Sequence, residues 1–293
     1  MKSLFSFRSG DSHRLRVIPC SCLLAILLMG PADQAHSEET PSPEVVDSEA
    51  PDSGGGDLAK QLANPVSSLI SVPFQANWDF GIGLNESSRF FLNMQPVVPF
   101  SINENMNLIS RTILPIIDAE SPAPGTPHAS GLGDTLQSFF FSPVDPVNGW
   151  IIGAGPVFLL PTATDDLLGS EKWGAGPTGV ALRQVGPWTY GALVNHIWSF
   201  AGDDARRNVN GTFIQPFVAY VTPSKTTFSL NLESSYNWDQ DQWTIPVNAV
   251  ISQLIPIGSQ PAQVFVGGRY YAEAPTGGPE WGIRTGITLL FPR

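Results

Sequence analysis

The sequence predicts an all-β protein, a twelve-stranded antiparallel transmembrane β-barrel with short periplasmic turns and longer external loops. Three observations predict this fold class: apolar and polar residues alternate from about residue 69 onward, the alternating segments are long, and their connections alternate in length. Composition agrees, because only 14% of the 293 residues are charged while 28 are Gly and 27 are Pro. So few charges suit a surface that meets lipid, and the many turn residues suit strands joined by tight connections.

The alternation has a period of two, which gives each strand one apolar and one polar face. In residues 70–82, ISVPFQANWDFGI, every even position is apolar, and the odd positions are polar, Pro or Gly. Residues 227–240, TFSLNLESSYNWDQ, and residues 280–291, EWGIRTGITLLF, repeat the pattern. Most tryptophans fall near predicted strand ends, where membrane barrels carry aromatic girdles.

Segment length separates a membrane barrel from a soluble sandwich. Most candidate strands have 11 to 15 residues, whereas globular strands have about 5–6 and a membrane-spanning strand needs about 9–11. Several prolines lie inside the strands and remove ladder donors, and bulges are one way to accommodate them: Pro96, Pro115, Pro156, Pro216 and Pro246. The predicted strands are 69–83, 88–101, 106–117, 133–143, 149–161, 174–185, 187–200, 211–222, 226–238, 242–255, 261–274 and 279–291.

The connections fix the orientation. Those after the even-numbered strands are short, and those after the third, fifth and seventh strands, residues 118–132, 162–173 and 201–210, are long. Outer-membrane barrels have short periplasmic turns, longer external loops and an even number of strands. The pattern therefore predicts that both termini lie in the periplasm.

Residues 1–37 have the features of a signal peptide: basic residues, a mostly apolar stretch at 17–29, and small residues around 35–37. A transmembrane anchor is the less favoured alternative, because the apolar run is shorter than the roughly 20 residues of a helical span. Cys20 and Cys22, the only cysteines, lie in this segment. Its removal would leave no disulfide and no cysteine metal site.

Residues 38–65 form an acidic leader rich in Pro and Gly, which we expect to be flexible, and residues 66–293 form the barrel. Within the leader, residues 57–64, DLAKQLAN, fit two interpretations. They form either two helical turns in the periplasmic mouth of the barrel or a frayed tether. The tether is the favoured interpretation.

The charge balance excludes one class of partner. Formal net charge is −11, and removal of residues 1–37, which carry a net +2, leaves −13. This argues against nucleic acid, whose recognition needs basic patches. We expect no cofactor, because no Gly-rich segment has the strand-to-helix context of a phosphate loop. Asp165, Asp166 and Glu171 lie in an external loop; there they either bind divalent ions that bridge lipopolysaccharide or, as we favour, are simply solvated.

The polar strand faces point into the lumen if the apolar faces meet lipid, because a lipid-facing charge costs several kcal/mol near the bilayer midplane. Arg269 and Glu273 are four residues apart on one strand, and Glu280 and Arg284 repeat this spacing on the next. We expect these four to form an interior ion-pair network. It serves either as a selectivity filter or ligand site or, as we favour, as a polar filling of a narrow barrel. The lumen-lining candidates, inward or at the rim, are Asp79, Arg89, Arg111, Arg183, Glu233, Arg269, Glu273, Glu280 and Arg284.

The sequence gives little support for an enzyme. Only His128 and His196 lie beyond the signal segment. His196, with Asn195 and Ser199 nearby, is similar to the catalytic groups of the outer-membrane phospholipase, which is also a twelve-stranded barrel. That enzyme aligns its groups on the outer wall, whereas neighbours on one strand point to opposite faces. We therefore expect no catalytic residues, and interpret His196 as a rim residue packed among tryptophans.

Three ordered stretches resemble a proteobacterial outer-membrane barrel family: GPVFLLPTATDDLLGSEKWGAGPT, GPWTYGALVNHIWSF and GGRYYAEAPTGGPEWGIRTGITLLFP. Members are usually described as transporters, some are mislabelled "neuromedin U", and the family is related to the barrel group of the phenol meta-cleavage pathway. The resemblance covers roughly residues 64–292. It implies a Gram-negative outer-membrane location and uptake of small or hydrophobic compounds. It defines no site residues, so none is carried over.

These observations predict a passive transporter or channel for small molecules, including hydrophobic or aromatic ones. The alternatives are a structural barrel with a plugged lumen and, less favoured, an outer-membrane lipid hydrolase. The expected partners are outer-membrane lipid, lipopolysaccharide, the barrel assembly machinery and an unidentified small solute. Many barrels end in an aromatic residue that the assembly machinery reads, but this chain ends Phe291-Pro292-Arg293, so Phe291 would serve from a shifted position.

Overall fold

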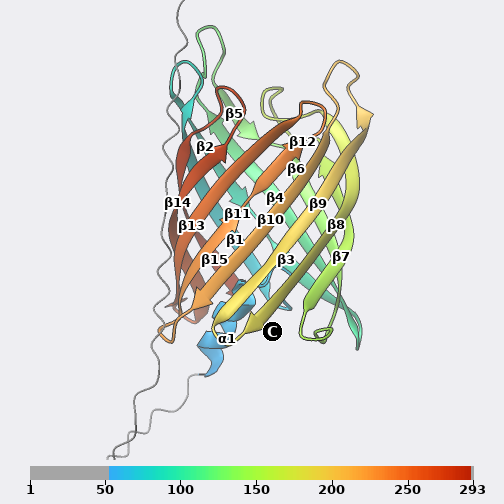
Figure 1. Cartoon of the computed structure of the whole chain (residues 1–293), viewed down its shortest axis with the longest axis vertical. Coiled ribbons are helices and arrows are strands. Elements are labelled where there is room, and N and C mark those ends of the chain that lie inside the picture. Colours follow the sequence, from blue (N-terminus) through green and yellow to red (C-terminus); the bar gives the residue numbers. More distant parts are fainter. Residues whose placement is uncertain (1–52, 292–293) are drawn as a thin grey trace, which may run out of the picture. The chain divides into compact units, whose positions relative to one another are not determined.

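A computed structural model describes residues 53–291, which form a closed antiparallel barrel with one short helix (Figure 1). The predicted signal peptide, and residues 38–52 of the predicted leader, lie outside the described residues. Closure comes from the pairing of the first strand with the last, from Ile70 opposite Phe291 to Phe80 opposite Trp281. The predicted all-β, twelve-stranded architecture is confirmed.

Fifteen hydrogen-bonded segments make up the twelve strands, because three strands are each split in two. The split strands are β2 with β3, β5 with β6, and β11 with β12. Every predicted strand has an observed counterpart whose ends differ by a few residues. The segments are β1 (Ile70–Ile82), β2 (Ser87–Met94), β3 (Val97–Asn103), β4 (Met106–Ala119), β5 (Ala129–Leu132), β6 (Thr135–Pro143), β7 (Ile151–Leu160), β8 (Lys172–Val185), β9 (Trp188–Gly202), β10 (Asn210–Val221), β11 (Thr226–Leu232), β12 (Ser234–Asn237), β13 (Gln242–Ile257), β14 (Gln260–Glu273) and β15 (Trp281–Phe291).

Proline explains the three interruptions. β2 gives way to β3 at Gln95-Pro96, beside Pro73 of β1. β11 gives way to β12 at Glu233, whose neighbour across the ladder is Pro246. A proline has no N–H to donate, so the ladder loses a bond on the partner strand as well. In both places the register continues unchanged across the break.

The third interruption is a true β-bulge. Pairing of β4 with β5 and with β6 differs in register by one residue, and the shift falls at Gly133 and Asp134. Pro115 of β4 lies opposite and accepts a hydrogen bond from the Gly133 N–H. Such bulges redirect a side chain. Here Asp134 leaves the pleat and caps the loop of residues 161–171, accepting hydrogen bonds from the N–H and hydroxyl of Ser170.

The two ends of the barrel differ in their connections. At one end, the loop end, residues 120–128, 161–171, 203–209 and 274–280 form the longer loops. At the other, the turn end, residues 104–105, 186–187 and 258–259 are tight turns. These connections follow the predicted contrast in length, whereas residues 144–150 at the turn end form a connection as long as residues 203–209, and residues 83–86 at the loop end form a short one. In the described part of the chain, no helix has the length and hydropathy to span a membrane.

The outer surface of the barrel is apolar between two sets of aromatic residues. Val194, Ile251 and Val266 are exposed in the middle of the wall. Exposed aromatic side chains gather towards both strand ends, Trp198 and Trp281 at the loop end and Trp188 at the turn end. Such a band, flanked by aromatic girdles, is typical of barrels that meet lipid.

A short helix, α1 (Ser53–Leu62), lies at the turn end (Figure 1). It is amphipathic, and Ala59 on its apolar side is fully buried. The Gln184 side chain of β8 donates a hydrogen bond to the Lys60 carbonyl, 2.8 Å away. The helical alternative for residues 57–64 is therefore the one observed, the favoured tether is wrong for these residues, and the helix begins earlier than expected.

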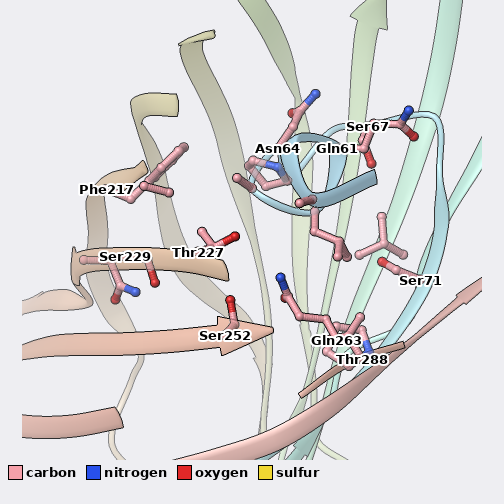
Figure 2. Close-up of a pocket in the computed structure, with 18 of the residues that line it drawn as sticks. Gln61, Asn64, Ser67, Ser71, Phe217, Thr227, Ser229, Ser252, Gln263 and Thr288 are labelled. Carbon is pink, nitrogen blue, oxygen red and sulfur yellow. The ribbon is translucent and has the colours of Figure 1, made fainter. Parts of the chain in front are cut away.

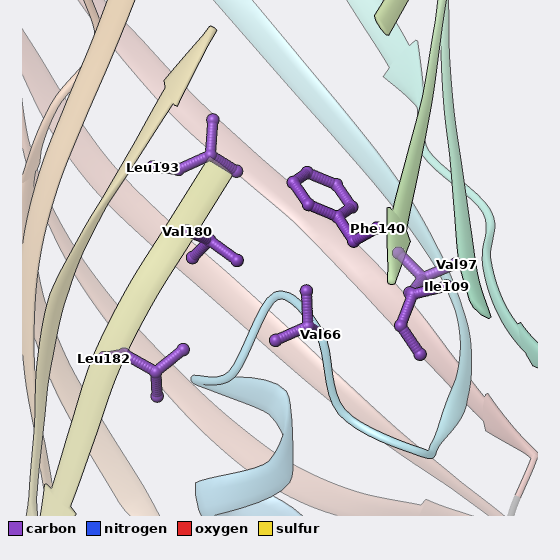
Figure 3. Packing of buried hydrophobic residues seen from close by; sticks show 7 residues of the cluster. All are labelled: Val66, Val97, Ile109, Phe140, Val180, Leu182 and Leu193. Atoms are coloured by element: carbon purple, nitrogen blue, oxygen red, sulfur yellow. The ribbon is translucent and has the colours of Figure 1, made fainter. Parts of the chain in front are cut away.

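The segment after α1 enters the barrel and packs against one side of its interior. Val66 lies among Val180, Leu182 and Ile109, with Val97, Phe140 and Leu193 completing the cluster (Figure 3). Ile109, Phe140 and Leu182 are fully buried. We call this cluster the apolar wall; it is formed by β3, β4, β6, β8 and β9, together with Val66.

Candidate functional site

Two cavities occupy the barrel interior. The first, of about 270 Å³, lies beside α1 and the following linker at the turn end. Hydroxyl groups from four strands point into it (Figure 2), and one of them, Thr227 Oγ1, is buried without a hydrogen-bond partner. We call this the hydroxyl cavity; its hydroxyl residues include Ser71, Thr227, Ser229, Ser252 and Thr288.

The second cavity, of about 320 Å³, lies farther along the interior. It is lined by β1, β2, β4 and β6 on one side and by β9, β10 and β12 on the other, so it lies between opposite walls. Its lining combines amide side chains with apolar ones, and we call it the mixed cavity. Three residues line both cavities and therefore mark the junction between them: Gln95, Arg111 and Gln215.

An ion-pair network fills the interior beside the mixed cavity. Arg284 binds Glu233 with both terminal nitrogens at 2.8 Å, and Arg269 approaches the same carboxylate at 3.3 Å. Strands β13 and β14 separate Glu233 from β15 in the wall, so this contact runs through the lumen. The Arg284 side chain is only 3% exposed. A buried pair of this kind is held by its bidentate geometry.

Asp79 forms the second acidic centre of the network. Its fully buried carboxylate accepts hydrogen bonds from Arg89 and from the Tyr271 hydroxyl, each at 2.8 Å. Arg269 links the two centres, because it lies 3.9 Å from Asp79 and 3.3 Å from Glu233. Asn77 Oδ1 accepts the Arg284 Nε–H at 2.8 Å. The guanidinium groups of Arg89 and Arg269 both pack on the ring of Phe91, at 5.4 and 5.5 Å from the ring centre. Such cation–π contacts strengthen where water is excluded.

The expected partners of Arg269 and Arg284 were wrong. The structure pairs these arginines with Asp79 and Glu233, whereas Glu273 and Glu280 are exposed at the loop end. A register shift between β13 and β14, between Ile245 and Pro246, falls just before Glu273 and breaks the alternation that the spacing assumed. Glu280 precedes β15 and belongs to the loop.

Arg183 is also placed differently from the prediction. Its neighbour Leu182 belongs to the apolar wall, so Arg183 points to the outer face, near the turn end. There its Nε–H donates to the Gly149 carbonyl and its guanidinium lies 5.7 Å from the Trp150 ring. Six of the nine candidates, Asp79, Arg89, Arg111, Glu233, Arg269 and Arg284, do face the interior.

Neutral residues complete the site and were not among the candidates. Gln95 accepts a hydrogen bond from Arg111 at 3.0 Å, Asn77 bridges the network, and Tyr271 binds Asp79. The alternation already assigned Asn77 to the polar face, so that signal was present. For Gln95, the signal was its position before an interrupting proline.

His196 lies on the outer face, as part of an aromatic cluster. Its Nδ1 is 2.7 Å from Thr212 Oγ1, which also accepts the Trp238 Nε1–H at 2.8 Å. The imidazole packs on Trp198, with ring centres 4.0 Å apart. Asn195 faces the mixed cavity instead. This is the expected packing of His196 among tryptophans.

The acidic residues of loop 161–171 serve as loop contacts. Glu171 forms an ion pair with Arg206 at 3.3 Å, and Asp165 accepts a hydrogen bond from the Leu167 N–H. Arg206 also donates to the Asp166 carbonyl at 2.6 Å, tying this loop to the loop of residues 203–209. Within residues 53–291, no group of His, Cys, Asp or Glu side chains has the arrangement of a metal site.

No family model matches the sequence, and no curated protein matches it. Solved structures do. An outer-membrane channel from Pseudomonas putida F1 aligns with a TM-score of 0.59 and 14% identity, over 76% of this chain and 94% of that one. Outer-membrane phospholipase A from Escherichia coli gives 0.49 and 10%, over 80% and 97%, and a KdgM porin gives 0.42 and 11%, over 76% and 99%. At these identities the likeness shows the fold alone: this chain has the fold of an outer-membrane barrel.

Proposed function

We propose that the chain is a passive outer-membrane channel or binding barrel for small molecules, with both termini in the periplasm. The observation that carries this proposal is the pair of adjoining cavities, which lie end to end inside the barrel. The apolar outer band with its aromatic girdles supports a membrane location. Fold likeness to a protein described as an outer-membrane channel is consistent with it.

A plugged structural barrel is the second candidate, and specific contacts favour it. The Glu233 and Asp79 ion pairs fill part of the lumen, and α1 and Val66 occupy the turn end. A channel requires the N-terminal segment or the ion pairs to move aside, whereas in a plugged barrel they stay in place. A barrel of twelve strands is intermediate between a filled eight-stranded barrel and an open sixteen-stranded channel.

The test is flux through purified protein, in liposome swelling and planar-bilayer recordings. We expect the wild-type protein to admit small solutes, and Val66→Asp to raise the conductance, because a charge at this apolar contact displaces the segment. Leu84→Ser, at an exposed loop position, is the matched control and should leave conductance unchanged. Absence of flux for every solute with both wild type and Val66→Asp would exclude a channel.

We propose further that the barrel has no lipid hydrolase activity. A hydrolase would need His196 to activate a free hydroxyl, yet the hydroxyl it contacts belongs to Thr212 and already binds Trp238. Phospholipid hydrolysis by the wild type that disappears in His196→Ala would contradict this.

Contacts with outer-membrane lipid, lipopolysaccharide and the barrel assembly machinery belong to the same proposal. Phe291 ends β15 opposite Ile70 and is partly exposed on the barrel surface, where an assembly factor would reach it.

A further inference from the structure

We propose that Arg111 is a specificity-determining residue that binds the carboxylate of small organic anions whose apolar body occupies the mixed cavity. This inference rests on the proposed channel or binding barrel and names its substrate class. Arg111 lies on β4 at the junction of the two cavities, so a solute passing from one to the other meets its guanidinium.

The guanidinium of Arg111 has hydrogen-bonding capacity to spare. In the structure, Arg111 Nη2 donates a hydrogen bond to Gln95 Oε1 at 3.0 Å. Arg284, by contrast, uses all three nitrogens on Asn77 and Glu233. A guanidinium has five N–H donors in a planar fork that matches a carboxylate. Arg111 is only partly buried, and it lines both cavities.

The charges around the mixed cavity favour an anion. The barrel interior holds the ion-pair network, with Arg89, Arg269 and Arg284 against Asp79 and Glu233, and in addition Arg111, so these six residues carry a net charge of +2. Arg111 and Glu233 line the mixed cavity itself. Both oxygens of Glu233 are bound by Arg284, and one also by Arg269, so this carboxylate is already neutralised by its partners. In a lumen of reduced dielectric constant, the uncompensated charge attracts an anion more strongly than it would in water.

The rest of the lining selects an organic body. Apolar side chains line the mixed cavity on both sides. Ile113 and Leu136 lie on the side of Arg111, and Ile197 and Phe213 lie across the lumen. Its volume of about 320 Å³ falls within the roughly 300–1,000 Å³ of small-molecule sites, which combine apolar walls with a few placed polar groups. An inorganic anion would leave these apolar surfaces unused, whereas an aromatic or branched aliphatic carboxylate would cover them.

The experiment measures binding to the full-length processed protein in detergent, by calorimetry, with three probes of similar shape and different charge. We expect benzoate to bind more tightly than benzamide, and benzamide more tightly than benzylammonium. Arg111→Gln should weaken benzoate binding about tenfold or more, because a charge-assisted bidentate contact is lost, and should leave benzamide nearly unchanged. Arg111→Lys should fall between wild type and Arg111→Gln, because it keeps the charge without the planar fork.

Arg183→Gln is the matched control, because it removes an arginine from the outer face at the turn end. It should bind benzoate as the wild type does, and a heat-modifiable shift in gel mobility confirms that each variant is a folded barrel. Equal binding of benzoate and benzamide, or unchanged benzoate binding in folded Arg111→Gln, would overturn the inference. Flux measurements test the channel separately. Solute flux without any charge preference would contradict the Arg111 site but not the channel. Arg111-dependent binding without any flux would contradict the channel but not the Arg111 site.

Discussion

The two sides of the barrel interior are built from different chemistry. The apolar wall packs Ile109, Phe140 and Leu182 against Val66, with contacts that depend on shape and volume. The opposite side, from β12 through β15 to β2, carries Glu233, Asp79 and their arginines, with contacts that depend on direction and charge. One side is a docking surface for the N-terminal segment, and the other fixes the electrostatics of the lumen.

The difference shows how one barrel interior can combine apolar packing with fixed charges. Apolar packing tolerates changes of shape at moderate cost, because neighbours relax into the space. A buried ion pair tolerates little, because removing one partner leaves an uncompensated charge. The apolar wall is therefore the side on which a segment can be released, and the charged side is the one that must stay fixed.

Glu233→Gln should give the largest effect. It leaves Arg284 and Arg269 without their carboxylate in a buried position, which we expect to cost about 3–5 kcal/mol of unfolding free energy. Urea unfolding in lipid vesicles, followed by tryptophan fluorescence, measures the loss. Glu273→Gln, at the exposed loop end, should change it by less than about 0.5 kcal/mol. Equal losses of unfolding free energy in the two variants would show that the interior carboxylate contributes no more than the exposed one.

Leu182→Ala tests the apolar wall and should cost less, about 2–3 kcal/mol, because Val66 can move towards the space that is left. The same urea titration measures it. Leu230→Ala, on an outer surface that is half exposed, serves as the control. Combined with Glu233→Gln, the two losses should add within about 0.5 kcal/mol, since the sites share no contacts. Strong coupling would show that the two sides act as one unit.

The smallest effect concerns a loop contact. A hydrogen bond from the Ser88 backbone N–H lowers the pKa of the Glu120 carboxyl, which is exposed and lies just beyond β4. Because the folded pKa is depressed, the stabilisation is present above the ordinary carboxyl pKa and is lost as pH falls through the lowered value. Amide exchange at Ser88 should therefore rise on acidification beyond the intrinsic pH dependence. Glu120→Gln should abolish this pH dependence of the exchange rate. If the pH dependence persists in Glu120→Gln, another titrating group causes it.

The strands, and which of their faces points into the barrel, could be predicted because period-two alternation is a local signal. Asp79 and Glu233 were correctly placed inside for the same reason. The pairing of Arg269 and Arg284 could not be predicted, because it depends on contacts across the lumen between strands far apart in sequence. The apolar wall was missed where both faces of a strand are apolar, as around Phe140, since alternation then loses contrast.

The docking of α1 was likewise beyond the sequence. Three glycines near its start weaken the helical signal, and the stabilising contacts come from the barrel, through Ala59, Val66 and the Gln184 hydrogen bond. A short helix of this kind is marginal alone and depends on tertiary packing. Its existence is a property of the folded barrel rather than of residues 53–62.

The prolines of the wall have a mechanical consequence. Gln95 precedes Pro96, Gln215 precedes Pro216, and Glu233 lies opposite Pro246, so three backbone positions around the cavity junction have no N–H to donate to a neighbouring strand. Inter-strand hydrogen bonds resist widening of the barrel, and a level with fewer backbone donors has fewer of them. We therefore expect the wall to resist dilation less at the junction than at a level where every strand residue has an N–H to donate.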